Sequence, residues 1–198
     1  MQNNIEGLLF IYIIVIMSAI FHEYAHAWMA YYLGDPTAKD AGRLTLNPIA
    51  HIDPFGTVIL PLLLMATGGI FIGYAKPVPF NPYNLTDQKY GPAKVAAAGP
   101  ASNFLIAIIF SIILRSVALP EFWNLAVSFI IYINIILGLF NLIPVPPLDG
   151  SKLLKRFTSI NFSMGRSFIG VLLALMIAFT IMRPIAQFIF TLLTGTGF

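Results

Sequence analysis

The chain has 198 residues, of which 58% are hydrophobic and only 10% are charged. Together with a mean hydropathy of +0.85, this composition excludes an ordinary water-soluble globule and indicates an integral membrane protein. Membrane topology explains the net charge of +3, because cytoplasmic loops are enriched in lysine and arginine. No basic helix indicates nucleic-acid binding. The lack of cysteine excludes disulfides and thiolate ligands, so nitrogen and oxygen atoms would have to bind any metal.

Residues 5–33 form the first apolar segment, which we expect to be a membrane-spanning helix and not a cleaved signal peptide. The segment contains His22-Glu23-Tyr24-Ala25-His26. On a helix, His22 and His26 lie one turn apart and project from the same face, as two ligands of one metal ion do. Glu23 points aside from that face, where its carboxylate can act as a base on a water molecule at the metal. Five residues therefore predict two ligands and a base.

The next 58 residues or so alternate between polar and broken apolar stretches. Residues 37–53 are polar and predict a loop outside the hydrocarbon. Residues 54–73 are apolar but contain Pro61 and the pair Gly68-Gly69, which predicts a broken span or a re-entrant segment. Residues 76–82 contain three prolines, which disfavour a helix. We expect a short membrane-associated β-strand or hairpin between residues 74 and 91.

Three further apolar segments follow, at residues 94–119, 123–142 and 167–193, the last with a kink expected at Pro184. Residues 151–166 are polar and basic. The sequence thus predicts an all-α membrane protein. We expect a polytopic transmembrane helix bundle of four to six apolar segments, together with the short membrane-associated β-strand or hairpin. We found no repeat and no second soluble domain, so residues 1–198 are expected to form a single intramembrane domain.

A catalytic zinc site commonly has three protein ligands and one open position, so the two histidines need a partner. The candidates for the third ligand are His51, Asp53, Asp87, Glu121 and Asp149. Asp149 is the strongest candidate because it closes a membrane span behind a proline-rich turn, where a carboxylate is costly unless it is paired or coordinating. The other four lie in predicted loops, where an acid or a lone histidine is unremarkable.

A shared metal requires the histidine motif and Asp149 to lie near the same membrane face, so their two helices should run in the same direction. An even number of crossings must then separate them, which makes residues 54–73 a re-entrant piece. The positive-inside rule makes the side of the metal cytoplasmic. Arg115 would lie near the opposite face, and the residues assigned to the cytoplasmic side are Lys39, Arg43, Lys76, Lys89, Lys94, Lys152, Lys155, Arg156 and Arg166.

The order of these motifs resembles the site-2 protease family of intramembrane zinc metalloproteases, in a compact form without a PDZ or nucleotide-sensing domain. Asn141, Pro144, Pro146, Asp149 and Gly150 match the family's second motif. Its Gly-Pro-x-x-Asn motif is matched at three further positions, namely Gly99, Pro100 and Asn103. The resemblance implies one zinc ion bound by three residues, with Glu23 as the general base. The implied zinc ligands are His22, His26 and Asp149.

The resemblance further implies an endopeptidase that cuts within or near transmembrane segments of protein substrates in the lipid bilayer, by a zinc-bound water that Glu23 activates. It favours a role for Asn141 in stabilising the oxyanion or holding the substrate backbone. The alternative is that Asn141 only bridges helices. Asn103 is expected to be structural. Residues 76–82 are candidates for pairing with an unwound substrate segment. A prokaryotic cell membrane is the expected location.

Two alternatives use the same three ligands. A metal transporter or metal-binding membrane protein would not need Glu23 and would often show repeated halves, which the sequence lacks. A proteolytically inactive scaffold would be free to lose its ligands and base, whereas all four residues are intact here. The oligomeric state and the substrate are not assigned by the sequence.

Overall fold

The computed structural model describes residues 5–66, 75–157, 176 and 178–198. Contacts within the chain group it into two compact units, Met1–Gly91 and Pro92–Phe198. The expectation of one intramembrane domain stays a prediction.

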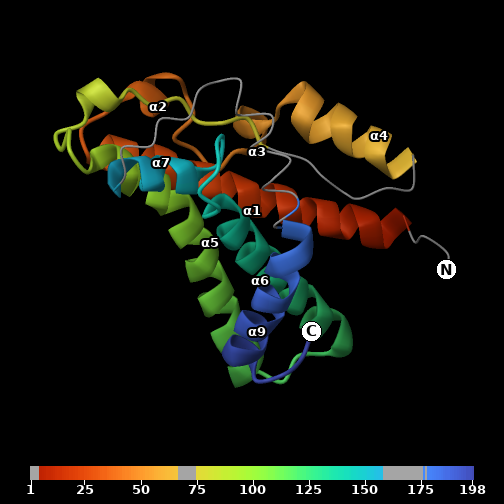
Figure 1. The fold of residues 1–198 in the computed structure, drawn as a ribbon. Coiled ribbons are helices and arrows are strands. Elements are labelled where there is room, and N and C mark those ends of the chain that lie inside the picture. Colours follow the sequence, from red (N-terminus) through yellow and green to blue (C-terminus); the bar gives the residue numbers. More distant parts are fainter. Residues whose placement is uncertain (1–4, 67–74, 158–175, 177) are drawn as a thin grey trace. The chain divides into compact units, whose positions relative to one another are not determined.

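The first unit is built on α1 (Ile5–Tyr32), a helix of 28 residues that is coloured red to orange in Figure 1. At 1.5 Å per residue, such a helix is about 42 Å long, enough to cross a bilayer. Its end follows the Schellman pattern. Gly34 has a φ of +100°, its N–H donates to Tyr31 O at 3.0 Å, and Asp35 N–H donates to Ala30 O at 2.9 Å. The predicted helix is confirmed to within one residue at its end.

Two single-turn helices, α2 (Thr37–Asp40) and α3 (Pro48–His51), pack against α1. They lie within the stretch predicted as a loop. The sequence explains α3, because Asn47 caps its start by accepting the Ile49 N–H at 3.1 Å and Pro48 fits a first helical turn. These short helices place Arg43 and His51 beside the following chain.

The apolar stretch predicted as broken begins with a π-helix, η1 (Pro54–Ile59), followed by α4 (Leu60–Ala66). The Asp53 carboxylate caps η1 by accepting the N–H groups of Phe55 at 3.0 Å and Gly56 at 2.7 Å. Residues 67–74 lie outside the described residues, so the re-entrant path stays a prediction. The described apolar helix Pro54–Leu63 is shorter than a membrane span.

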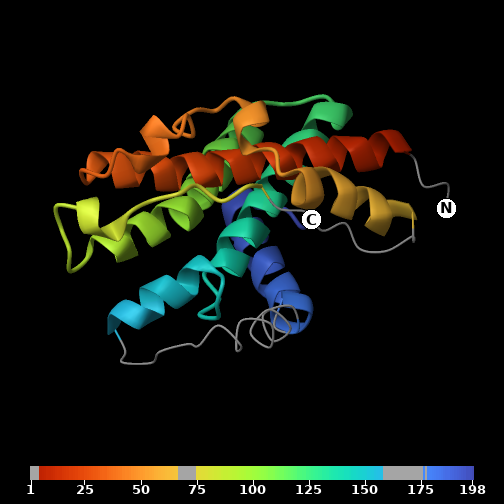
Figure 2. The same ribbon diagram turned by 90° about the horizontal axis from the view of Figure 1, so that it is seen from above.

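Residues 75–81 are extended and lead into a 3₁₀ turn, η2 (Pro82–Asn84). No described residue is in a β-strand, so the strand or hairpin is not confirmed. The physical reason is that backbone donors are missing or already used. Pro77 and Pro79 have no N–H, and the N–H groups of Lys76 and Val78 bind residues of the same unit. Figure 2 shows this yellow trace running alongside the second half of α1.

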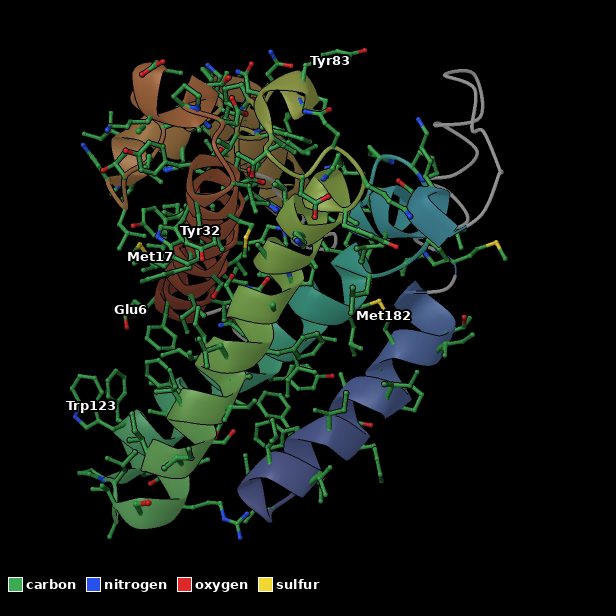
Figure 3. All side chains as sticks on the ribbon, turned by 90° about the vertical axis from the view of Figure 1, so that its left-hand side faces the viewer. Glu6, Met17, Tyr32, Tyr83, Trp123 and Met182 are labelled. Carbon is green, nitrogen blue, oxygen red and sulfur yellow. The ribbon has the colours of Figure 1, made fainter. Side chains whose placement is uncertain are left out.

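The exposed tip of this extended chain is Tyr83, whose side chain is 86% exposed and points outward in Figure 3. Behind it, the Asp35 carboxylate accepts the Asn81 N–H at 2.6 Å and the Asn84 side-chain amide at 2.9 Å. The end of α1 and the extended chain are thus joined through one buried acid.

The second unit contains α5 (Gly91–Ser116), which starts at the last residue of the first unit, together with α6 (Glu121–Asn141) and α9 (Arg183–Thr194). A π-helix, η3 (Ala178–Met182), precedes α9, so the helix type changes next to Pro184, where a kink was expected. Figure 1 shows α5, α6 and α9 side by side. Their shared core consists of small and branched residues around one aromatic ring, namely Ala107, Val127, Ile131, Ile135, Ala186 and Phe190.

After α6, the proline-rich segment is non-helical, as predicted, and includes a cis peptide bond between Pro146 and Pro147. The short helix α7 (Asp149–Phe157) follows. Ile143 from this segment packs with Met182 in a small apolar cluster, and Figure 3 shows Met182 at the start of the blue helix. The proline cluster therefore ends α6 and starts α7 at Asp149.

Three described helices are long and apolar enough to cross a membrane, namely Glu6–Tyr32, Gly91–Ser116 and Glu121–Asn141. This agrees with a multi-pass membrane protein. The expected four to six apolar segments are not confirmed, because Pro54–Leu63 and Thr180–Thr194 are shorter helices. Residues 158–175 and 177, which include much of the last predicted segment, lie outside the described residues.

Candidate metal centre and catalytic site

The two histidines predicted to bind a metal lie on one face of α1. The Nε2 atoms of His22 and His26 are 3.0 Å apart, and their rings meet edge to face with centroids 4.6 Å apart. Zinc–nitrogen bonds of about 2.0–2.1 Å at tetrahedral angles would place two ligand nitrogens about 3.3 Å apart. The two imidazoles therefore fit a shared zinc ion with little movement. His22 is 6% exposed, which limits the access of bulk water to its ring.

Glu23 lies between the two histidines in sequence but has a different partner. Its Oε2 atom accepts the backbone N–H of Val78 at 2.8 Å. Val78 belongs to the extended residues 75–81 and is 55 positions away in sequence. The carboxylate is half-buried and held by a main-chain donor, so its direction is fixed from outside its own helix.

Asp149 is the first residue of α7 and is 4% exposed. Its Oδ1 atom forms an ion pair with Lys152 Nζ at 2.8 Å, one turn further along the same helix. A carboxylate at a helix start interacts favourably with the positive end of the helix dipole. Lys152 thus supplies a positive charge beside this carboxylate, and an ionised carboxylate is the form that binds zinc.

Gly150, the residue after Asp149, lies where the backbone leaves no room for a side chain. A Cβ atom on Gly150 would lie 2.2 Å from Leu142 O and 2.6 Å from Ile143 O. Both are backbone atoms of the segment that leaves α6, so no side-chain rotation could relieve the clash. Only glycine allows the start of α7 to approach the end of α6 this closely.

The candidate asparagines differ in their surroundings. Asn141 is half-buried, and its Nδ2 donates to Leu137 O of its own helix at 3.0 Å. Asn103 is fully buried and donates to Asn134 Oδ1 at 2.8 Å, which links α5 to α6. Asn134 was missed by sequence reasoning, although an amide in the middle of a predicted span was a signal for an interhelical hydrogen bond.

Structural contacts account for most of the other third-ligand candidates. Asp53 caps η1, and Asp87 accepts the N–H groups of Lys89 and Tyr90 at 3.1 and 2.8 Å in the turn that precedes α5. His51 is buried, with its Nε2 atom 2.7 Å from Thr45 O. Glu121 occupies the first turn of α6, where an acid favours the helix dipole.

A sequence profile of Peptidase family M50 matches residues 115–183. This range contains Asp149, whereas His22 and His26 lie before it. The chain is 40% identical over 159 residues to "Putative zinc metalloprotease YwhC" of Bacillus subtilis, an alignment that covers 74% of this chain and 68% of YwhC.

Two other relatives match over shorter parts of their own length. The chain is 34% identical over 139 residues to "Putative zinc metalloprotease Rip2" of Mycolicibacterium smegmatis, covering 68% of this chain and 52% of Rip2. It is 24% identical over 171 residues to "Zinc metalloprotease MJ0392" of Methanocaldococcus jannaschii, covering 84% of this chain and 39% of MJ0392. No solved structure matches the chain.

The names of these three relatives all describe zinc metalloproteases. The imidazole pair and the adjacent carboxylate on α1 are side chains of the kind that such an enzyme uses. The chain belongs to Peptidase family M50, the site-2 protease family, and is a zinc metalloprotease. The family resemblance seen in the sequence is confirmed.

Proposed function

We propose that this zinc metalloprotease is an intramembrane endopeptidase that hydrolyses peptide bonds within or near transmembrane segments of other proteins. The observation that carries the proposal is the position of the His22 and His26 pair on α1, a helix long and apolar enough to cross a membrane. Ionisable side chains in a membrane span are costly and usually mark a functional site. Two histidines and a glutamate in such a helix therefore support a reaction that takes place within the membrane.

We assign one zinc ion to His22, His26 and Asp149. The donor set fits the metal, because zinc binds imidazole nitrogen and carboxylate oxygen and the chain has no cysteine. When bound, zinc supplies Lewis-acid polarisation of the carbonyl and lowers the pKa of water. In this assignment His22 and His26 contribute Nε2, and Asp149 contributes a carboxylate oxygen.

Glu23 acts as the general base in this proposal. Its carboxylate accepts the proton of the attacking water and later delivers a proton to the leaving amine nitrogen. The Val78 N–H holds Oε2, which leaves Oε1 to move the proton. Among the described residues, no other hydrogen bond to the Glu23 carboxylate is present.

Asn141 is proposed to hold the substrate backbone or the developing oxyanion. One of the two hydrogens on Asn141 Nδ2 is donated to Leu137 O. A side-chain amide has a second hydrogen that it can donate. A donor aimed at a developing negative charge is worth about 100- to 1,000-fold in rate in other hydrolases. Asn141→Leu should therefore lower kcat without releasing zinc.

The expected pairing of residues 76–82 with a substrate strand loses support. Three of the N–H groups in this stretch, those of Lys76, Val78 and Asn81, are already bound within the first unit. Its prolines have none to offer. A substrate would therefore find few donors for a β-ladder here.

We propose that the zinc site faces the cytoplasmic side of a prokaryotic cell membrane. The basic residues assigned to one face, among them Lys39 and Lys152, support this orientation through the positive-inside rule. Because the chain has no cysteine, single cysteines at Lys39 and Arg115 can be labelled without background. Labelling of both from the same side would contradict the topology.

The test of the function uses purified protein with a model transmembrane substrate and a parallel zinc assay. Cleavage by the zinc-loaded protein, loss of cleavage with a chelator and recovery on adding zinc are expected. Zinc binding without any cleavage of membrane substrates would instead favour the metal-binding or scaffold alternatives.

A further inference from the structure

We infer that Arg43 is a positioning residue for Glu23, acting through a strap of extended backbone, residues 76–81. The inference rests on the proposed role of Glu23 as the general base. Arg43 acts on the Glu23 carboxylate indirectly. It binds the strap, and the strap binds the carboxylate.

The first link joins Arg43 to the strap. The Nη2 atom of Arg43 donates to Lys76 O at 2.5 Å and lies 3.5 Å from Pro77 O. Arg43 is only 7% exposed, and its buried Nε has no hydrogen-bond partner. Burying a guanidinium is costly unless it is paired, yet the two hydrogen-bond acceptors of this one are neutral carbonyls. A contribution to the free energy of unfolding alone therefore does not explain why a cation is buried at this position.

The turn after α2 fixes the backbone of Arg43. Gly42 has a φ of +67°, its N–H donates to Lys39 O at 2.9 Å, and the Arg43 N–H donates to Ala38 O at 2.8 Å. This is the Schellman pattern again. The guanidinium therefore reaches the strap from a rigid base that packs against α1 through α2.

The second link joins the strap to Glu23. Residues 76 and 78 precede prolines, which restricts them to extended conformations, and the proline rings fix φ at 77 and 79. Hydrogen bonds hold both ends, from Lys76 N to His51 O at 3.0 Å and from Asn81 N to Asp35 Oδ2 at 2.6 Å. Between these anchors, the Val78 N–H donates to Glu23 Oε2 at 2.8 Å. A stiff strap keeps this donor still.

The chain of contacts has a mechanistic consequence. A general base works only if its free oxygen is held within hydrogen-bond reach of the reacting proton. The strap fixes Oε2 and so orients Oε1. Without Arg43, Lys76 O and Pro77 O lose their donor, and the Val78 N–H can move away from the carboxylate.

The first test measures the contact without using zinc or cleavage. Hydrogen exchange of the Val78 amide is followed in the metal-free protein, in detergent. We expect slow exchange in the wild type and exchange at least about tenfold faster in Glu23→Ala and Arg43→Lys, because a broken or loosened hydrogen bond exposes the amide. Wild-type exchange in either variant would overturn the inference.

The second test separates positioning from folding and metal binding. Arg43→Lys keeps the charge but loses the planar fork, whereas Val78→Pro is compatible with an extended backbone but replaces the N–H donor with a ring carbon that faces Glu23. Each should lower kcat by about 10- to 100-fold, the usual effect of removing a supporting contact, with KM and zinc content as in the wild type. Val78→Ala, which keeps the N–H, should retain much more activity than Val78→Pro.

Arg115→Lys is the matched control, because Arg115 also donates to a backbone carbonyl, Leu193 O at 3.4 Å, but in the second unit. It should leave kcat unchanged. Wild-type kcat in Arg43→Lys, or a loss of kcat that follows a loss of zinc, would overturn the positioning role. Failure of the wild type to cleave any substrate would contradict the proposed function instead, while the exchange experiment would still test the contact.

Discussion

The Nε2 atoms of His22 and His26 lie 3.0 Å apart on one face of α1, while Glu23 Oε2 is bound by the Val78 N–H. The two proposed zinc ligands and the proposed base therefore point in different directions from the same helix. The two histidine Nε2 atoms lie close to each other, whereas the Glu23 carboxylate is held by the extended chain at Val78. This separation leads to distinct expectations for the variants of each residue.

Replacement of Glu23 by glutamine should abolish proteolysis and leave zinc bound. Gln keeps the size of the side chain but cannot take a proton, and loss of a general base typically lowers the rate by about 100- to 10,000-fold. The measurement is kcat with a model transmembrane substrate beside the zinc content. Glu6→Gln, at the start of the same helix, is the control. Full activity in Glu23→Gln would remove Glu23 from the mechanism.

Gly150→Ala should disturb Asp149 through the backbone. The new Cβ would meet Leu142 O at 2.2 Å, and forcing extra atoms into a packed site costs about 1–3 kcal/mol. We expect a lower thermal unfolding midpoint in detergent and weaker zinc binding. Gly7→Ala is the control, because a Cβ there meets nothing within 4 Å. Wild-type zinc affinity in Gly150→Ala would show that α7 can shift without cost to the metal site.

The Asn103 and Asn134 side chains should couple in stability but not in catalysis. Their buried hydrogen bond of 2.8 Å links α5 to α6, and such bonds between membrane helices contribute about 0.6–1.7 kcal/mol. A double-mutant cycle with Asn103→Ala and Asn134→Ala measures the coupling in the free energy of unfolding. Ser111→Ala, which loses only a bond to its own helix, is the control. A coupling near zero, or loss of zinc in Asn103→Ala, would contradict a structural role.

Asp35 should make the first unit more stable at neutral than at acidic pH. Burial alone raises the pKa of this carboxyl, but hydrogen bonds from Thr37, Asn84 and Asn81 outweigh it and lower the pKa below the ordinary value of 3.8. A lowered pKa in the folded state means that the stabilisation is complete above the ordinary value and is lost as pH falls through the lower folded value.

The variant Asp35→Asn tests this dependence. At pH 7 it should unfold at a lower temperature than the wild type, because hydrogen bonds to a charged acceptor contribute about 1.5–3 kcal/mol. The difference between the two proteins should shrink as the pH is lowered past 3.8. A difference that stays constant with pH would mean that the carboxylate charge contributes nothing.

Sequence reasoning succeeded where the contacts are local. The helix period alone places His22 and His26 on one face, and the proline cluster before Asp149 ends α6 because proline cannot continue a helix. The short strand or hairpin expected between residues 74 and 91 is not confirmed, and the chain with alternating prolines, residues 76–81, shows why. Their N–H groups bind residues as distant as Glu23, 55 positions away, and no local pattern specifies such a partner.

The buried polar residues show the same limit. Asn103 was expected to be structural, but nothing in the local sequence identified Asn134 as its partner on α6. Arg43 was counted only as a loop charge, although it is buried against Lys76 O. Burial depends on the packing of distant segments, so it could not be predicted for either residue from the local sequence.

The most direct test of the zinc site is a zinc titration of metal-free wild type, Glu23→Gln and Asp149→Ala. The assignment predicts one zinc ion per chain in the wild type and in Glu23→Gln, and a large loss of affinity in Asp149→Ala, because a two-ligand site binds zinc weakly. Wild-type zinc affinity in Asp149→Ala would contradict the assignment and direct attention to His51 and Asp53.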